Sequence, residues 1–351
     1  EVEVAGGVLN TVSIAPPTSY VGATVIDPTP GYHDLPVATL DFASLYPSIM
    51  QANNIGPGSY VLPGDVAAVR KLAAEGKIKV NVISTASIDP TSAIKTLHDK
   101  QRKAAAAAAA SQDSTCESPA AESPTATASS SSSSSPSSSQ VEEDDFDDTT
   151  HFFVATETYK GLVPKLLAKL LKARRDVKKQ MKKEKDKFKY AMLNSKQLAI
   201  KISCNSVYGF FGVKAGYLPC WPVAASTTAT GRRYIDQTKE AVEKKYCVAN
   251  GYDGDAAVVY GDTDSVMVKF GGIPRSMEGM KKAWKLAEEA AEFVSDMTFA
   301  DEKEIVLEAE KVYWPYMIWD TKKRYIGRCY MHPDYPPKID AKGVELVRRD
   351  N

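Results

Sequence analysis

The spacing of apolar residues along the chain predicts a mixture of strands and helices. Short runs rich in β-formers and bounded by Pro, Gly or Asp are typical of strands, whereas apolar residues recurring every three or four positions are typical of helices. Strands are predicted over residues 20–26, 37–40, 256–268 and 305–314, a basic turn entering a strand over 321–327, and helices from residue 162 and over 192–208, 224–246 and 276–297.

The segment around residues 256–268 has the pattern of a hairpin with an acidic tip. Apolar β-formers flank a short polar turn that contains Asp262 and Asp264. Side chains alternate along an extended strand, so both carboxylates can point the same way, and a divalent cation would offset their repulsion. Aspartate is also a common turn residue, so this segment, taken alone, favours a solvated turn over a metal site.

A second carboxylate, Asp41, follows the buried strand formed by Val37, Ala38 and Leu40. Ligands often bind beside the end of a strand, which favours a functional role for Asp41. The alternative is that Asp41 caps the helix that follows.

The charges of the chain cancel overall but are distributed unevenly. There are 44 Lys or Arg and 44 Asp or Glu. Residues 89–150 contain an alanine run, a serine run and a closing acidic run, a composition that predicts disorder. Residues 160–189 then carry thirteen Lys or Arg against three acidic residues, which favours a polyphosphate or nucleic-acid partner over a merely solvated helix face.

The next helix carries an unusual stripe. Lys201, Asn205 and Tyr208 fall at positions i, i+4 and i+7, with Gln197 one turn earlier, and Gly209 is expected at the C-terminal cap. This helix and the basic helix before it, in which Arg174 and Lys178 share a face, predict an antiparallel hairpin that closes over a phosphate-bearing substrate.

Cysteine spacing and hydropathy narrow the class of protein. Five widely spaced cysteines without a C-x-x-C pair argue against a zinc site or a disulfide framework and favour a reducing compartment. No run of eighteen apolar residues and no opening signal peptide is found, so no membrane partner is expected. The chain lacks an initial methionine and stops in mid-element, so we expect it to be part of a longer protein.

Four motifs, in order, resemble those of the family B DNA polymerases. Residues 41–49 (DFASLYPSI) are similar to the first palm motif, and residues 201–209 (KISCNSVYG) to the fingers motif. Residues 260–265 (YGDTDS) resemble the second palm motif, and residues 322–325 (KKRY) the primer-side motif. Residues 338–351 are similar to the approach to the thumb. Residues 51–57 and the low-complexity segment depart from the pattern of the eukaryotic replicative members.

The resemblance implies an α+β fold: an antiparallel palm sheet backed by helices, with a helical-hairpin fingers subdomain. Its implied segments are palm over 1–88 with the first catalytic aspartate, the disordered insertion over 89–150, fingers over 151–212, palm over 213–330 and the start of the thumb over 331–351.

The resemblance also implies the site. Asp41, Asp262 and Asp264 would be catalytic, and these three carboxylates with the Phe42 carbonyl would hold two Mg²⁺ ions, Asp262 in a secondary role. Glu308 or Glu310 would add acidity, and Tyr46 would lie beneath the sugar. The nucleotide would contact Ser44, Leu45, Tyr46, Arg174, Lys178, Lys201, Asn205 and Tyr208, and the DNA would contact Gly209, Lys322, Lys323, Arg324 and Tyr325.

The implied activity is DNA-directed DNA synthesis in replication, with primer–template DNA, deoxynucleoside triphosphates and accessory replication subunits as partners. The implied location is the nucleus or a viral replication site. Two alternatives are a degenerate polymerase kept as a nucleic-acid-binding scaffold, and an RNA-synthesising nucleotidyltransferase. All three carboxylates are present, which disfavours the scaffold, and Tyr46 disfavours RNA synthesis.

Overall fold

A computed structural model describes residues 21–85 and 149–346. The expected low-complexity segment therefore lies outside the described residues, apart from Thr149 and Thr150. Thr150 is the first residue of a strand, β5. The proposed start of the thumb is described up to Leu346.

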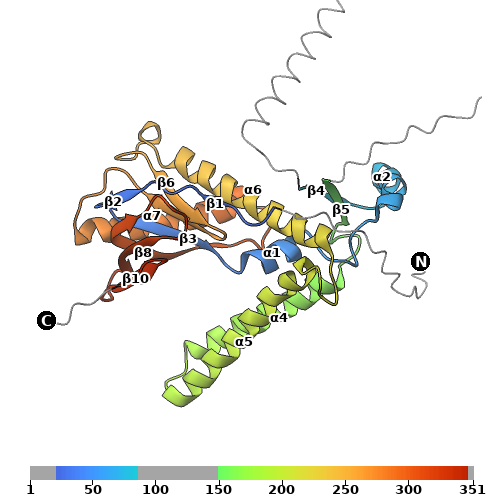
Figure 1. The fold of residues 1–351 in the computed structure, drawn as a ribbon, viewed down its shortest axis with the longest axis horizontal. Coiled ribbons are helices and arrows are strands. Elements are labelled where there is room, and N and C mark those ends of the chain that lie inside the picture. Colours follow the sequence, from blue (N-terminus) through green and yellow to red (C-terminus); the bar gives the residue numbers. More distant parts are fainter. Residues whose placement is uncertain (1–20, 86–148, 347–351) are drawn as a thin grey trace, which may run out of the picture. The chain divides into compact units, whose positions relative to one another are not determined.

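Most strands belong to one antiparallel sheet of eight strands, which confirms the α+β fold (Figure 1). Its order is β1-β6-β7-β3-β8-β9-β10, with β2 also paired to β8. The strands are β1 (Val25–Ile26), β2 (Gly31–His33), β3 (Val37–Phe42), β6 (Ala257–Asp262), β7 (Ser265–Lys269), β8 (Leu307–Ile318), β9 (Tyr325–Tyr330) and β10 (Lys338–Lys342). The first expected strand, over residues 20–26, is reduced to β1.

Side chains alternate along a strand, and in the central strand β3 those on both faces are buried. In β3, Ala38 and Leu40 belong to a large core that also contains residues of helices α6 (Trp221–Lys245) and α7 (Met277–Phe293). Val37 belongs to a second cluster on the other face, formed mainly with tyrosines and aliphatic residues of β6, β8 and β9. β3 is thus fixed from both sides at the centre of the sheet.

Helix α6 begins earlier than its sequence predicts. The Ser/Thr cluster around residue 226 suggests an N-terminus, but the helix starts at Trp221 with Pro222 in its first turn, where proline is well tolerated. Ser226 to Thr230 are buried within the helix. α7 begins as a capped helix should, since the Ser276 hydroxyl accepts a hydrogen bond from the Gly279 amide at 3.2 Å. It is followed by a π-helical turn, Val294–Thr298.

The predicted helical hairpin is present as α4 (Leu162–Met181) and α5 (Lys187–Gly212), which lie side by side in Figure 1. α4 buries Leu167 and Leu171, while Leu162 is 74% exposed. The expectation that Gly209 caps the second helix is wrong, because α5 continues for three more residues and buries Phe211 in the core.

Helix α1 (Leu45–Ala52) packs against α4, α5 and α6. Beyond it lie α2 (Val66–Ala74) and a two-stranded sheet of β4 (Val80–Ser84) and β5 (Thr150–Val154). Short 3₁₀ turns cover Pro63–Asp65 and Val248–Asn250. Among the described helices, none is long and apolar enough to cross a membrane.

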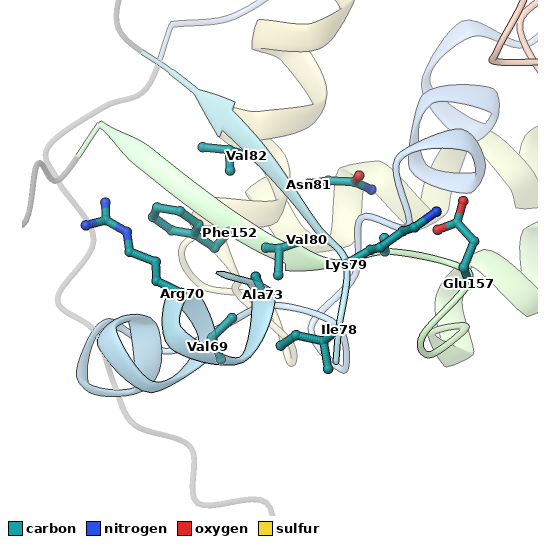
Figure 2. A pocket seen from close by; sticks show the side chains of 11 residues that line it. Val69, Arg70, Ala73, Ile78, Lys79, Val80, Asn81, Val82, Phe152 and Glu157 are labelled. Carbon is teal, nitrogen blue, oxygen red and sulfur yellow. The ribbon is translucent and has the colours of Figure 1, made fainter. Parts of the chain in front are cut away.

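A hollow lies between α2 and the β4–β5 sheet (Figure 2). It measures about 500 Å³, and Arg70, Val80 and Phe152 are among its lining residues. The Arg70 guanidinium lies 5.1 Å from the centre of the Phe152 ring. None of the site residues implied by the sequence lines this hollow.

Candidate active site

Asp41 and Asp264 meet where β3 runs beside the β6–β7 hairpin. Asp41 is paired in register with Ser265, the first residue of β7, and the Phe42 amide donates to the Asp264 carbonyl at 2.8 Å. Asp264 lies in the two-residue turn and not in a strand, because Asp262 pairs with Ser265. Thr263 has a φ of 60°, which fits such a tight turn. Strand alternation therefore does not determine the relative directions of Asp262 and Asp264.

The electrostatics of this carboxylate group are unfavourable without a cation. Burial, followed by the negative charges of Asp264 and Glu310, raises the pKa of Asp41 to about 7. Burial also raises the pKa of Asp264, with Asp262 and Glu310 adding to the effect. The positive charge of Lys201 acts in the opposite direction on both groups.

Glu310 lies near these carboxylates because of an irregularity in β8. Thr39 pairs with Lys311 whereas Leu40 pairs with Ala309, which leaves Glu310 as an extra residue in β8. Such a bulge changes the direction of the side chains around it. Glu310 forms an ion pair with Lys311 at 3.0 Å. The charge of Glu310 raises the pKa of Asp41, whereas the charge of Lys311 lowers it. Lys311 was missed by the sequence analysis.

Glu308 is the register partner of Asp41. Its negative charge favours the charged form of Lys178 in α4 and so opposes the lowering of the Lys178 pKa. Asp41 is not the cap of α1, since Ser44 occupies the N-cap position with a left-handed φ of 54°.

Asp262 forms an ion pair with a lysine from another part of the chain. The Lys323 Nζ lies 2.7 Å and 2.9 Å from the two carboxylate oxygens of Asp262. The Lys323 amide also donates to the Tyr260 hydroxyl at 2.8 Å. The hydrogen bond to Asp262 raises the pKa of Lys323. Asp262 therefore connects the hairpin to the loop before β9.

The donor set suits a hard cation, although no compact metal centre is formed in advance. Among the described residues, no three His, Cys, Asp or Glu side chains are grouped closely enough to hold a metal ion. Asp41 and Asp264 are nevertheless half-buried carboxylates whose mutual repulsion a divalent cation would relieve, and oxygen ligands are those that Mg²⁺ prefers.

Cations from α4 and α5 approach the same end of β3. The Arg174 Nη1 donates to the Ser44 hydroxyl at 3.0 Å, and its Nε donates to Gln197 Oε1 at 3.4 Å. Burial, followed by the Arg174 charge, lowers the pKa of Lys178. Together with Lys201, these side chains place positive charge opposite the carboxylates, as anion binding requires.

Two tyrosine rings, one from α1 and one from α5, lie close together. The Tyr46 and Tyr208 rings are 4.6 Å apart between centroids and inclined by 42°. Asn205 is exposed one turn beyond Lys201 on α5, and Leu45 is buried. The structure thus brings together α1, which follows Asp41, and α5, which carries Lys201 and Tyr208. Gly209 lies within α5.

The loop before β9 holds the remaining residues implied by the resemblance. Lys322 pairs with Asp27 at 2.9 Å and donates to the Val25 carbonyl at 2.8 Å. Arg324 is exposed, whereas Tyr325 begins β9 and is buried against other tyrosines. Phe42 is also buried, with its ring near Phe299.

Several proteins with similar sequences are DNA polymerase subunits. DNA polymerase delta catalytic subunits are 41% identical over 332 residues in Schizosaccharomyces pombe, 37% over 334 residues in Dictyostelium discoideum and 39% over 332 residues in Drosophila melanogaster. These matches cover 94% to 95% of this chain and 23% to 24% of each relative. The chain therefore spans about a quarter of the length of the curated relatives it matches.

The sequence profile described as DNA polymerase family B matches residues 8–104 and 121–351, which is most of the chain and includes every motif discussed above. The chain belongs to DNA polymerase family B.

Proposed function

We propose that this chain is the polymerising core of a DNA-directed DNA polymerase, which adds deoxynucleotides to a primer 3′ hydroxyl under the direction of a template. The observation that carries the proposal is the convergence of Asp41 and Asp264 at one end of β3, with Arg174 and Lys201 near them. The names of the relatives support the same activity.

Two Mg²⁺ ions fit the proposal, held by the carboxylates of Asp41 and Asp264 and by the Phe42 carbonyl. When bound, they would neutralise phosphate charge and activate the 3′ hydroxyl. Asp262 would play a secondary role in holding the ions, because its carboxylate is also ion-paired with Lys323.

The basic hairpin supplies the other positive charges. Arg174, Lys178 and Lys201 would bind the triphosphate, while Asn205 and Tyr208 would border the nascent base pair. Backbone amides of Ser44, Leu45 and Tyr46 would add donors, because they lie in the turn at the start of α1. The α4–α5 hairpin would serve as the fingers and close over a correct pair.

The remaining assignments follow from this arrangement. Residues 1–88 and 213–330 would form the palm, 151–212 the fingers and 331–351 the start of the thumb, with the segment 89–150 as an insertion. Gly209, Lys322, Lys323, Arg324 and Tyr325 would contact DNA. Accessory replication subunits would bind elsewhere in the protein, which would act in the nucleus or at a viral replication site.

The test is extension of a primed DNA template by the full-length protein, with and without Mg²⁺, using deoxynucleotides and ribonucleotides in parallel. Templated, Mg²⁺-dependent addition of deoxynucleotides is the expected result. Binding of primed DNA without addition would favour the scaffold alternative, and preference for ribonucleotides would favour an RNA-synthesising enzyme.

Replacing Tyr46 by Ala is expected to raise the ratio of ribonucleotide to deoxynucleotide incorporation by about tenfold or more, because the ring would no longer exclude a 2′ hydroxyl. Competitive primer extension measures the ratio. Tyr335→Ala, at a tyrosine that is 66% exposed, is the control and should leave it unchanged. Unchanged discrimination in Tyr46→Ala would remove Tyr46 from this role.

Replacing Lys323 by Ala is expected to weaken binding of primed DNA about fivefold, since one contact to the DNA backbone is lost. The slope of the logarithm of the binding constant against the logarithm of the salt concentration should become shallower by about one. Binding is measured by fluorescence anisotropy across a salt series. Lys281→Ala is the matched control, because Lys281 is also exposed and paired with an aspartate, Asp334, at 3.2 Å. Equal effects of the two variants would contradict a specific contact at Lys323.

A further inference from the structure

A buried glycine, Gly231, lies in the middle of α6 and faces α1. Glycine within a helix is less favourable than alanine, so its presence there calls for a packing reason. A Cβ atom at this position would lie 3.2 Å from Tyr46 Cε1, 3.5 Å from Ile49 Cδ1 and 3.8 Å from Leu45 Cδ2. Only the contact with Tyr46 is closer than ordinary van der Waals distance. The missing side chain therefore makes room for the Tyr46 ring.

The Tyr46 ring is also bounded by two other side chains. Tyr208 of α5 lies 4.6 Å away between ring centroids. Arg232, the residue after Gly231, has its charge close to the hydroxyls of both tyrosines. Its Nη1 donates to the carbonyls of Val21 and Gly22 at 2.8 Å and 2.7 Å. The ring is half-buried between three helices, and α6 forms its floor.

We propose that Gly231 is a positioning residue for Tyr46: the bare backbone of α6 sets the depth of the tyrosine ring, and through it the width of the space for the nucleotide sugar. This inference rests on the proposed function, in which Tyr46 lies beneath the sugar. Gly231 itself does not touch the substrate.

Adding a methyl group at Gly231 has a definite direction of effect. At 3.2 Å the neighbouring atom must yield by a few tenths of an ångström. Since α6 lies on one side of the ring and Tyr208 limits another, the ring moves toward the sugar. Gly231→Ala is expected to raise the KM for deoxynucleotides about fivefold and to leave kcat within about twofold, because binding of the substrate is impaired but the reacting groups are untouched. Discrimination against ribonucleotides is retained or strengthened, the reverse of Tyr46→Ala.

The experiment is a double-mutant cycle of wild type, Gly231→Ala, Tyr46→Ala and the combined variant in the full-length protein. The KM for deoxynucleotides and the ribonucleotide ratio are measured for each. Gly231→Ala should raise the KM of the wild-type protein. Adding Gly231→Ala to the Tyr46→Ala variant should change the KM of that variant by less than about 1.5-fold. Ile49→Val combined with Gly231→Ala is the control, because it removes the second contact and should leave the KM effect in place.

Thermal unfolding provides a readout that is independent of catalysis. Gly231→Ala should lower the melting temperature when Tyr46 is present and raise it in the Tyr46→Ala background, where alanine is simply the better helix former. The same KM factor in both backgrounds, no KM change in wild type, or rescue by Ile49→Val would overturn the proposal. If the wild type adds no nucleotide, the proposed function fails, and the change of sign in melting temperature still decides whether Gly231 accommodates Tyr46.

Discussion

Replacing Asp264 by Asn is expected to reduce Mg²⁺-dependent primer extension by about a thousandfold. An amide has nearly the size of a carboxylate but carries no charge, so it cannot balance a divalent cation beside Asp41. Primed-DNA binding should persist, because Asp264 is not among the residues proposed to contact DNA. Single-turnover extension and a gel shift on the same protein separate the two effects.

Asp301→Asn is the matched control, since Asp301 is exposed and lies outside the site. It should retain wild-type extension. An Asp264→Asn protein that keeps more than about a tenth of the wild-type rate would show that Asp264 is not needed for charge balance, and the proposed metal-binding role of Asp264 would then be wrong.

Replacing Asp41 by Asn is expected to stabilise the metal-free protein while abolishing extension. Burial, Asp264 and Glu310 raise the pKa of Asp41 to about 7. Between its ordinary pKa of 3.8 and this value, the native state binds more protons than the unfolded state, so stability falls as the pH rises through that window. At pH 8 the ionised carboxylate costs about 2–4 kcal/mol, which the neutral amide avoids. Near pH 4 the two proteins should be equally stable.

Hydrogen exchange of peptides covering β3 and β8, with thermal melting alongside, measures this difference at both pH values. Mg²⁺ should slow exchange in the wild type and leave Asp41→Asn unaffected, because only the wild type gains free energy from binding the cation. Faster exchange in Asp41→Asn at pH 8 would mean that Lys201 and Lys311 already balance the charge of Asp41.

Local sequence patterns were sufficient for the elements whose periodicity is strong. The hairpin around Thr263 and the α4–α5 pair follow from alternation and helical spacing. The strand predicted over residues 37–40 is present but continues to Phe42, so Asp41 lies within β3 and not after it. The interpretation of Gly209 as a cap failed, because Phe211 two residues later gains more from burial in the core than the chain gains by ending the helix. Tertiary packing overrode a local signal there.

The finer geometry of the site depended on contacts between distant residues. Lys323 and Asp262 are 61 residues apart, and neither carries a local sign of its partner. Glu310 reaches the carboxylates through a bulge in β8, which alternation alone does not reveal. The small sheet also escaped prediction, since its strands are separated by the low-complexity segment.

The β4–β5 sheet determines where the length of this chain can vary during evolution. Ser84 and Thr150 are register partners, and the Thr85 hydroxyl and amide both donate to the Thr149 carbonyl. The two ends of the intervening 63 residues are therefore fastened about one strand spacing apart. Because closure entropy rises only with the logarithm of length, replacing this segment by a tight turn changes the free energy by about 2 kcal/mol. Insertions and deletions can accumulate between these two anchor points while β3 and the hairpin carrying Asp264 keep their places.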